Sequence, residues 1–132
     1  MKRRPVERFR AKDYLQRAEE CKNAMDHAFE TREWNACIIN AIHCAISAAD
    51  AFCVYKKGLR SASENHFEAI ALFSSIDSND PDIKRCVEHL SSLISIKSGA
   101  EYGEKLMSEN YAIQAKKHAE RLLEFVRAKI NI

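Results

Sequence analysis

Glycine and proline are scarce in this chain, with only 3 glycines and 2 prolines among 132 residues. Folds made of many short strands need a turn roughly every 8–12 residues, and such turns draw on these two residue types. Their scarcity therefore argues against a β-sandwich or a barrel. Low-complexity disorder is also disfavoured, because 46% of the residues are hydrophobic. A chain of this length has room for one core, so we predict a single domain over residues 1–132.

The sequence also lacks the paired cysteine spacing of a disulfide framework or a zinc site. Its 5 cysteines are an odd number, and no two of them form a Cys-x-x-Cys motif. A secretory leader is not indicated, because the basic residues at the start run directly into the polar stretch Glu7–Asp13. We therefore expect reduced, mostly buried thiols in a cytoplasmic protein, with no bound metal and no cofactor.

One apolar stretch, residues 34–55, is long enough to cross a membrane. Asn40, His43, Ser47 and Asp50 interrupt it, and such groups are costly in lipid, which favours a core helix and no membrane partner. Their spacing of 3, 4 and 3 places all four on one stripe of an otherwise apolar helix. Such a helix would face both its own bundle and a second subunit, so we expect a homodimer through it. The stripe would then be either a buried hydrogen-bonded network or the wall of a cleft.

The formal charge of +2 is unevenly distributed along the chain. Residues 1–12 carry a charge of +5, residues 13–104 a charge of −6 and residues 105–132 a charge of +3. A basic start of this kind either follows a nucleic-acid backbone or is a solvated, partly frayed head, which we place at residues 1–10. Its basic residues are Lys2, Arg3, Arg4, Arg8, Arg10 and Lys12.

Apolar residues recur at intervals of 3 and 4 in each long segment, which is typical of amphipathic helices. Gly58 suits the left-handed cap of a helix over 34–57, and Asp80 followed by Pro81 suits the start of another. Ser61 and Glu64 have the spacing of a capping box, which predicts a helix beginning at Ser61. Further helices are predicted over 11–31 and 108–129, and the helix that begins near 80 either closes near Gly99 or continues to Gly103. The predicted fold is all-α, an antiparallel up-and-down bundle of four or five helices with short connections.

Arg60 and His66 bracket the predicted connection between the second and third helices. A guanidinium can hold two phosphate oxygens, and an imidazole can take or return a proton near neutral pH. If the substrate is RNA, its 2′-hydroxyl can serve as the nucleophile, so this pair could act on a phosphodiester without a metal. The purely structural alternative pairs Arg60 with Asp50 or Glu64 and packs His66 among its apolar neighbours.

The remaining histidines give no comparable pattern. His27, His89 and His118 stand on separate predicted helices, without metal-ligand spacing to one another or to a cysteine. We expect surface or boundary positions for all three.

Several short motifs follow one another in a characteristic order. The apolar helix reads Ala-Ala-Asp-Ala over residues 48–51, and Gly-Leu-Arg follows at residues 58–60. His66 comes next, and a late Ala-Glu-Tyr stands at residues 100–102. From about Tyr14 to Val126, this order resembles the compact HEPN domains, small helical bundles often found beside minimal nucleotidyltransferases.

The resemblance implies a homodimer in which the two Arg-x(4–6)-His motifs approach each other across the interface. Active members are metal-independent endoribonucleases, commonly the toxin of a toxin–antitoxin pair. Carried over, Arg60 would bind phosphate, His66 would act as acid and base, and Asp50 would orient one of them. Active members usually carry Asn, Asp or His directly after the arginine, where this chain has Ser61. The residues expected in or beside the cleft are His43, Ser47, Asp50, Lys57, Arg60, Ser61, His66, Lys97, Glu101 and Tyr102.

Two hypotheses for the function remain open at this point. The first is an RNA-directed protein with endoribonuclease activity through Arg60 and His66. The second is a catalytically inactive module of the same fold that binds a nucleotide or a protein, for example a minimal nucleotidyltransferase.

Overall fold

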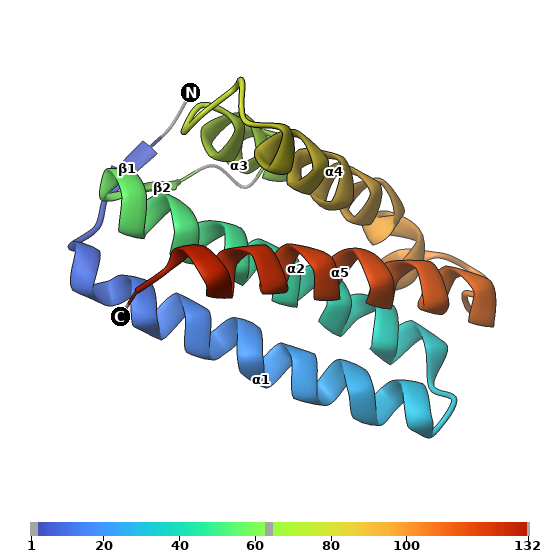
Figure 1. Cartoon of the computed structure of the whole chain (residues 1–132). Helices are drawn as coiled ribbons and strands as arrows, with labels where there is room; N and C mark the ends of the chain where they lie inside the picture. Colours follow the sequence, from blue (N-terminus) through green and yellow to red (C-terminus); the bar gives the residue numbers. More distant parts are fainter. Residues whose placement is uncertain (1–2, 63–64, 132) are drawn as a thin grey trace.

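The fold is helical, as the sequence predicts. A computed structural model describes residues 3–62 and 65–131, and within them five α-helices hold most of the residues (Figure 1). The long ones run side by side with short connections, so the predicted all-α class is confirmed. The helices are α1 (Ala11–Glu30), α2 (Trp34–Lys57), α3 (His66–Ser74), α4 (Pro81–Tyr102) and α5 (Glu109–Lys129).

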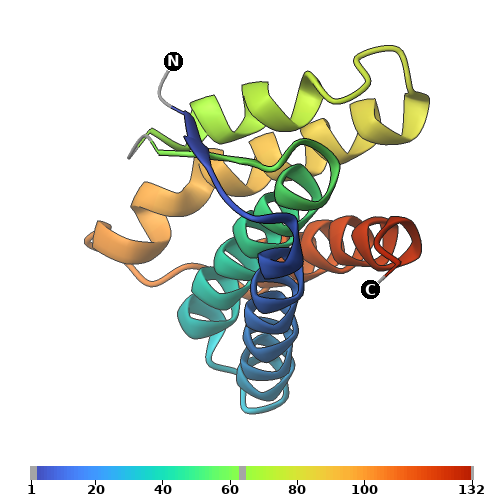
Figure 2. The same cartoon turned by 90° about the vertical axis from the view of Figure 1, so that its left-hand side faces the viewer.

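The central helix is α2. It packs against α1, α3, α4 and α5, and Figure 2 shows these helices arranged around it. Thirteen of its 24 residues are buried, whereas a stripe through Asn40, His43 and Ser47 stays partly or fully open to solvent. The helix is long and apolar enough to cross a membrane, but 72% of its most apolar window is buried in the fold, as in a core helix. Most of its apolar surface is therefore covered by other helices of the same chain.

Three of the predicted helix ends are confirmed. Gly58 closes α2 in the left-handed conformation with φ 63°, which a glycine adopts without steric cost. The side chain of Asp80 caps α4 by accepting a hydrogen bond from the backbone N–H of Asp82, with Pro81 at the first helical position. At its other end α4 continues past Gly99 to Tyr102, which was the longer of the two predicted forms.

The start of α3 differs from the prediction. Ser61 lies in a short strand, and α3 begins at His66, where the side chain of Asn65 accepts a hydrogen bond from the backbone N–H of Phe67. Asn65 therefore replaces Ser61 as the capping residue, and Glu64 lies outside the described residues.

A two-stranded antiparallel ribbon joins the start of the chain to the segment after α2. Strand β1 (Arg3–Pro5) pairs with β2 (Leu59–Ser61), which places Arg4 opposite Arg60. The N–H of Val6 donates to the carbonyl of Gly58 at 2.9 Å, and a 3₁₀ turn, η1 (Arg8–Arg10), leads into α1. Residues 3–10 are thus held against the body of the protein, where a frayed head was expected; residues 1 and 2 lie outside the described residues.

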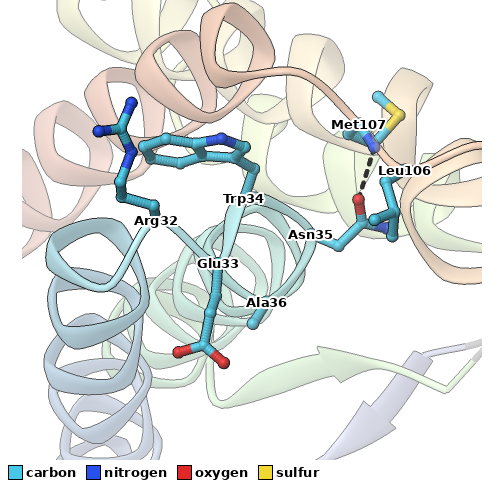
Figure 3. Close-up of a pocket in the computed structure, with 7 residues that line it drawn as sticks. All are labelled: Arg32, Glu33, Trp34, Asn35, Ala36, Leu106 and Met107. Carbon is cyan, nitrogen blue, oxygen red and sulfur yellow. Dashed lines mark hydrogen bonds between the residues drawn. The ribbon is translucent and has the colours of Figure 1, made fainter.

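At the end of the bundle away from the ribbon, the side chain of Asn35 connects two segments of the chain. Its side-chain Nδ2 donates to the carbonyl of Ala100 at 2.7 Å, and its Oδ1 accepts from the N–H of Met107 at 2.6 Å. One side chain on the first turn of α2 therefore holds both the end of α4 and the segment before α5. Figure 3 shows its contact with Met107. An apolar hollow of about 410 Å³ lies beside this contact, lined by Arg32, Glu33, Trp34, Asn35, Ala36, Leu106 and Met107.

The cysteines are free thiols in the core or at its edge, in line with the expected reduced state. Cys21 is half-buried, whereas the other four are buried. Burial raises the pKa of the Cys37 thiol to about 11, so the thiolate form that reacts is scarce near neutral pH.

Candidate functional site

Arg60 is held by a buried carboxylate. Its Nε donates to Oδ2 of Asp50 at 3.1 Å, and Asp50 is only 6% exposed. Burial penalises the charged carboxylate more than the charge and hydrogen bond of Arg60 stabilise it, so the pKa of Asp50 rises from 3.8 to about 6. The ion pair named as the structural alternative for Arg60 is thus present, and it fixes the orientation of the guanidinium.

The same guanidinium also lies against an aromatic ring. The Cζ atom of Arg60 is 5.3 Å from the centre of the Tyr14 ring, and the Cζ atom of Arg17 is 5.2 Å from it. Tyr14 itself is 8% exposed, so α1 supplies a fixed surface for both cations. The side chain of Arg60 remains 32% exposed. It is therefore both oriented and accessible to an anion from solvent.

His66 is the first residue of α3 and is half-buried. Burial lowers its pKa, and the positive charges of Lys97, His43 and Arg60 lower it further, against the opposing charge of Glu101. A histidine shifted in this direction is mostly neutral near pH 7 and can accept a proton.

Two charged residues on α4 complete this group. Nζ of Lys97 lies 3.1 Å from Glu101 one helical turn later. Burial disfavours the Glu101 carboxylate, but the hydrogen bond and charge of Lys97 outweigh it and lower its pKa. His43 also contributes to the lower pKa of Glu101 and to that of His66. Side chains from α2, α3 and α4 thus influence one another electrostatically around His66.

The remaining predicted residues have different placements. Ser47 is half-buried on α2, between His43 and Asp50 in the sequence, and Ser61 is in β2 opposite Arg3. Tyr102 is 79% exposed at the end of α4 and hydrogen-bonds Glu101. Lys57 instead lines a separate hollow with Ile76, Asp77 and Lys129, among others.

Sequence reasoning missed two features of the structure. It did not associate Tyr14 or Arg17 with Arg60, because both precede Arg60 by more than 40 residues and Tyr14 has an ordinary place on the apolar stripe. It also treated His89 and His118 as unrelated residues, whereas their Nδ1 atoms lie 2.9 Å apart between α4 and α5. Across residues 3–62 and 65–131, no three His, Cys, Asp or Glu side chains gather in a group that could hold a metal ion.

The geometry combines a fixed cation with a neutral base. Arg60 can hold phosphate oxygens in its two-pronged geometry, and His66 on the adjoining segment can take a proton. His43 and Lys97 provide further polar and positive groups beside His66. Such a set is suited to a phosphodiester whose own hydroxyl group is the attacking nucleophile.

Comparison with known proteins identifies the family. The HEPN domain model matches residues 11–129 of the 132-residue chain, which includes all five α-helices. A search of the curated proteins found no match. The matched segment contains Asp50, Arg60, His66, Lys97 and Glu101. The chain therefore belongs to the HEPN domain family.

Proposed function

We propose that this protein acts on RNA as a metal-independent endoribonuclease through Arg60 and His66. The supporting observation is the contact between Arg60 and the buried Asp50, which orients the guanidinium. Arg60 lies in β2, and His66 begins the next helix, α3. The lower pKa of His66 supplies a base in its neutral form at physiological pH.

The proposed reaction is an internal transfer at phosphorus. His66 removes the proton of the ribose 2′-hydroxyl, the 2′-oxygen forms a bond to phosphorus, and the bond from phosphorus to the 5′-oxygen breaks. Arg60 neutralises the charge that develops on the non-bridging oxygens. The departing 5′-oxygen takes a proton back from His66, which returns the histidine to its starting form. The products are a 2′,3′-cyclic phosphate and a 5′-hydroxyl, so the step needs no water and no oxidant.

A homodimer remains part of the proposal. Two aromatic side chains that adjoin site residues in the sequence are exposed, Phe67 by 60% and Tyr102 by 79%. Phe67 follows His66 and Tyr102 follows Glu101 in the sequence, so a second copy that covered them would also close the site. Sedimentation of wild type and Phe67→Ser protein tests this arrangement, and we expect the substitution to weaken dimerisation.

The cleavage assay uses purified protein, single-stranded RNA and EDTA. We expect products with cyclic phosphate ends from wild type and at least a hundredfold slower cleavage by Arg60→Ala and His66→Ala proteins. Arg121→Ala and His27→Ala are matched controls on α5 and α1 and should cleave at the wild-type rate. Equal cleavage by all four variants would disprove the assigned roles.

Binding without cleavage would instead favour the second function. A protein that binds RNA or a nucleotide in EDTA but leaves the strand intact is the catalytically inactive module, for which a minimal nucleotidyltransferase is a candidate partner. The Arg60→Ala substitution should still weaken that binding, because the guanidinium contacts phosphate in either case.

A further inference from the structure

The start of the chain concentrates positive charge next to Arg60. Residues 3–17 contain six basic and two acidic residues. The β1–β2 ribbon and α1 fix this segment in place, because β1 pairs with β2 and the N–H of Val6 bonds to Gly58. The charge is therefore held on a defined surface of the folded protein and is not a solvated tail.

Three guanidinium groups share one buried carboxylate. Arg4 lies directly opposite Arg60 in the ribbon, and directly opposed residues of an antiparallel pair project to the same face. Arg17 approaches Arg60 from α1 through the shared Tyr14 ring. The charges of all three act on Asp50, and Arg60 also hydrogen-bonds to it, so positive charge gathers around this carboxylate. Like charges at this spacing favour an added anion.

Aromatic side chains alternate with the cations along the same surface. One hollow of about 270 Å³ is lined by Val6, Arg10, Asp13, Tyr14 and Arg17. A second, of about 440 Å³, is lined by Arg8, Phe9, Tyr55 and Lys56. Phe9 is 53% exposed, and the Cζ atom of Arg10 lies 4.8 Å from the centre of its ring. Each hollow thus offers both a flat ring and positive charge.

We propose that this surface binds single-stranded RNA. We call it the N-terminal ridge and define it as residues 3–17 together with Tyr55 and Lys56. Cations would follow the phosphates, while Phe9 stacks on an unpaired base. A duplex keeps its bases stacked on one another, so it cannot use the exposed ring. This proposal rests on the proposed function, because the ridge leads a strand through Arg4 to Arg60 and His66.

Binding is measured separately from cleavage. Fluorescence anisotropy with a 5′-fluorescein 12-nucleotide oligouridine in EDTA, in the His66→Gln background, gives affinities without turnover. Phe9→Ala should weaken binding by about tenfold. The Arg8→Ala, Arg17→Ala double variant should reduce the slope of log affinity against log salt by about 1.4, the effect of losing two phosphate contacts to a single strand.

Matched controls come from the exposed face of α5. Arg121→Ala and Tyr111→Ala change the same residue types outside the ridge, and both should bind with unchanged affinity. Phe9→Leu keeps an apolar side chain without an aromatic face, and should lose nearly as much affinity as Phe9→Ala. Thermal melting of each variant confirms that it is folded.

The outcomes separate this proposal from the proposed function. Ridge-dependent binding by a wild-type protein that does not cleave RNA would disprove the nuclease and support the ridge. If the wild-type protein cleaves RNA and the ridge variants bind RNA with wild-type affinity, the ridge proposal is wrong and the proposed function stands. Equal affinity for a 12-base-pair RNA duplex, or equal competition by poly-glutamate, would also overturn it, because either would show binding by charge without stacking.

Discussion

The Nδ1 atoms of His89 and His118 lie 2.9 Å apart, although 29 positions separate the two residues in the sequence. One ring must donate to the other at this distance, so at least one imidazole has to be neutral. Burial lowers the pKa of both residues, and the nearby charge of Arg121 lowers both further. The contact between α4 and α5 is therefore sensitive to acid.

The first prediction concerns stability against pH. Since the pKa of each histidine is lower in the folded state, the unfolded chain binds more protons near pH 6, and the free energy of unfolding falls as the pH drops below 6.5. We expect His118→Gln to flatten this fall between pH 7 and pH 5. Denaturant unfolding at several pH values measures it, with His27→Gln as the control. An unchanged slope in His118→Gln would contradict the prediction.

Asp50 should have the opposite dependence on pH. Its pKa rises from 3.8 to about 6 on folding, so its stabilising contribution is fully present below about pH 4 and is lost as the pH rises through about 6. This difference in pKa corresponds to about 3 kcal/mol in the free energy of unfolding. Asp50→Asn should remove this dependence on pH. Asp13→Asn changes an exposed pair with Arg10 and should leave the profile unaltered. The same unfolding series in Asp50→Asn protein provides the measurement.

Asn35 should contribute more to stability than its polarity suggests. Asn35→Ala removes two hydrogen bonds between segments that are far apart in the sequence, and we expect a loss of about 2 kcal/mol in the free energy of unfolding. Asn40→Ala is the matched control, because the Asn40 side chain bonds only to the carbonyl of Ala36 in the same helix. Similar losses in the two variants would show that Asn35 does not tie α4 and α5 to α2.

Two glycine substitutions should have effects of opposite sign. An added Cβ at Gly58 would meet no atom closer than 3.5 Å, so the expected loss of about 1 kcal/mol in Gly58→Ala comes from the left-handed backbone alone. Gly99→Ala lies inside α4, with the nearest atom at 3.6 Å, and should gain about 0.5–1 kcal/mol from its higher helix propensity. Thermal unfolding compares the two variants. A loss in Gly58→Asn as large as that in Gly58→Ala would argue against backbone strain, since asparagine tolerates this conformation.

The last prediction applies to the proposed nuclease. The charge of Lys97 lowers the pKa of His66, so Lys97→Met should raise that pKa and move the acid limb of kcat/KM to higher pH. Lys84→Met is the control on the exposed side of the same helix. An unchanged acid limb in Lys97→Met protein would mean that a group other than His66 titrates there.

Helices and their ends followed from local chemistry. Gly58, Asp80 and Pro81 each act within one turn of their own position, so a single sequence is enough to predict them. The ribbon was not predictable in this way. Its strands have three residues each, too few to show an alternating pattern, and β1 forms only because Arg3–Pro5 lies beside Leu59–Ser61 in the fold. That pairing also took Ser61 away from its predicted role as a cap.

The candidate site can be proposed from the sequence, but its surroundings cannot. The stripe on α2 and the spacing of Arg60 and His66 are visible in the sequence, because both patterns lie within short stretches. Tyr14 and Arg17 approach Arg60 only through the packing of α1 on α2, which no local pattern reports. The packing of α4 and α5 on α2 is likewise not visible in any local pattern.

The ribbon also sets an order for folding. Residues 3–5 and 59–61 flank the hairpin of α1 and α2 in the sequence, so their pairing closes a long loop, and we expect the strands to meet after both helices have formed and packed. Arg60 therefore reaches its place beside Arg4 late in folding. Fraying at this end of the hairpin would undo the site first, while the rest of the helical core stays intact.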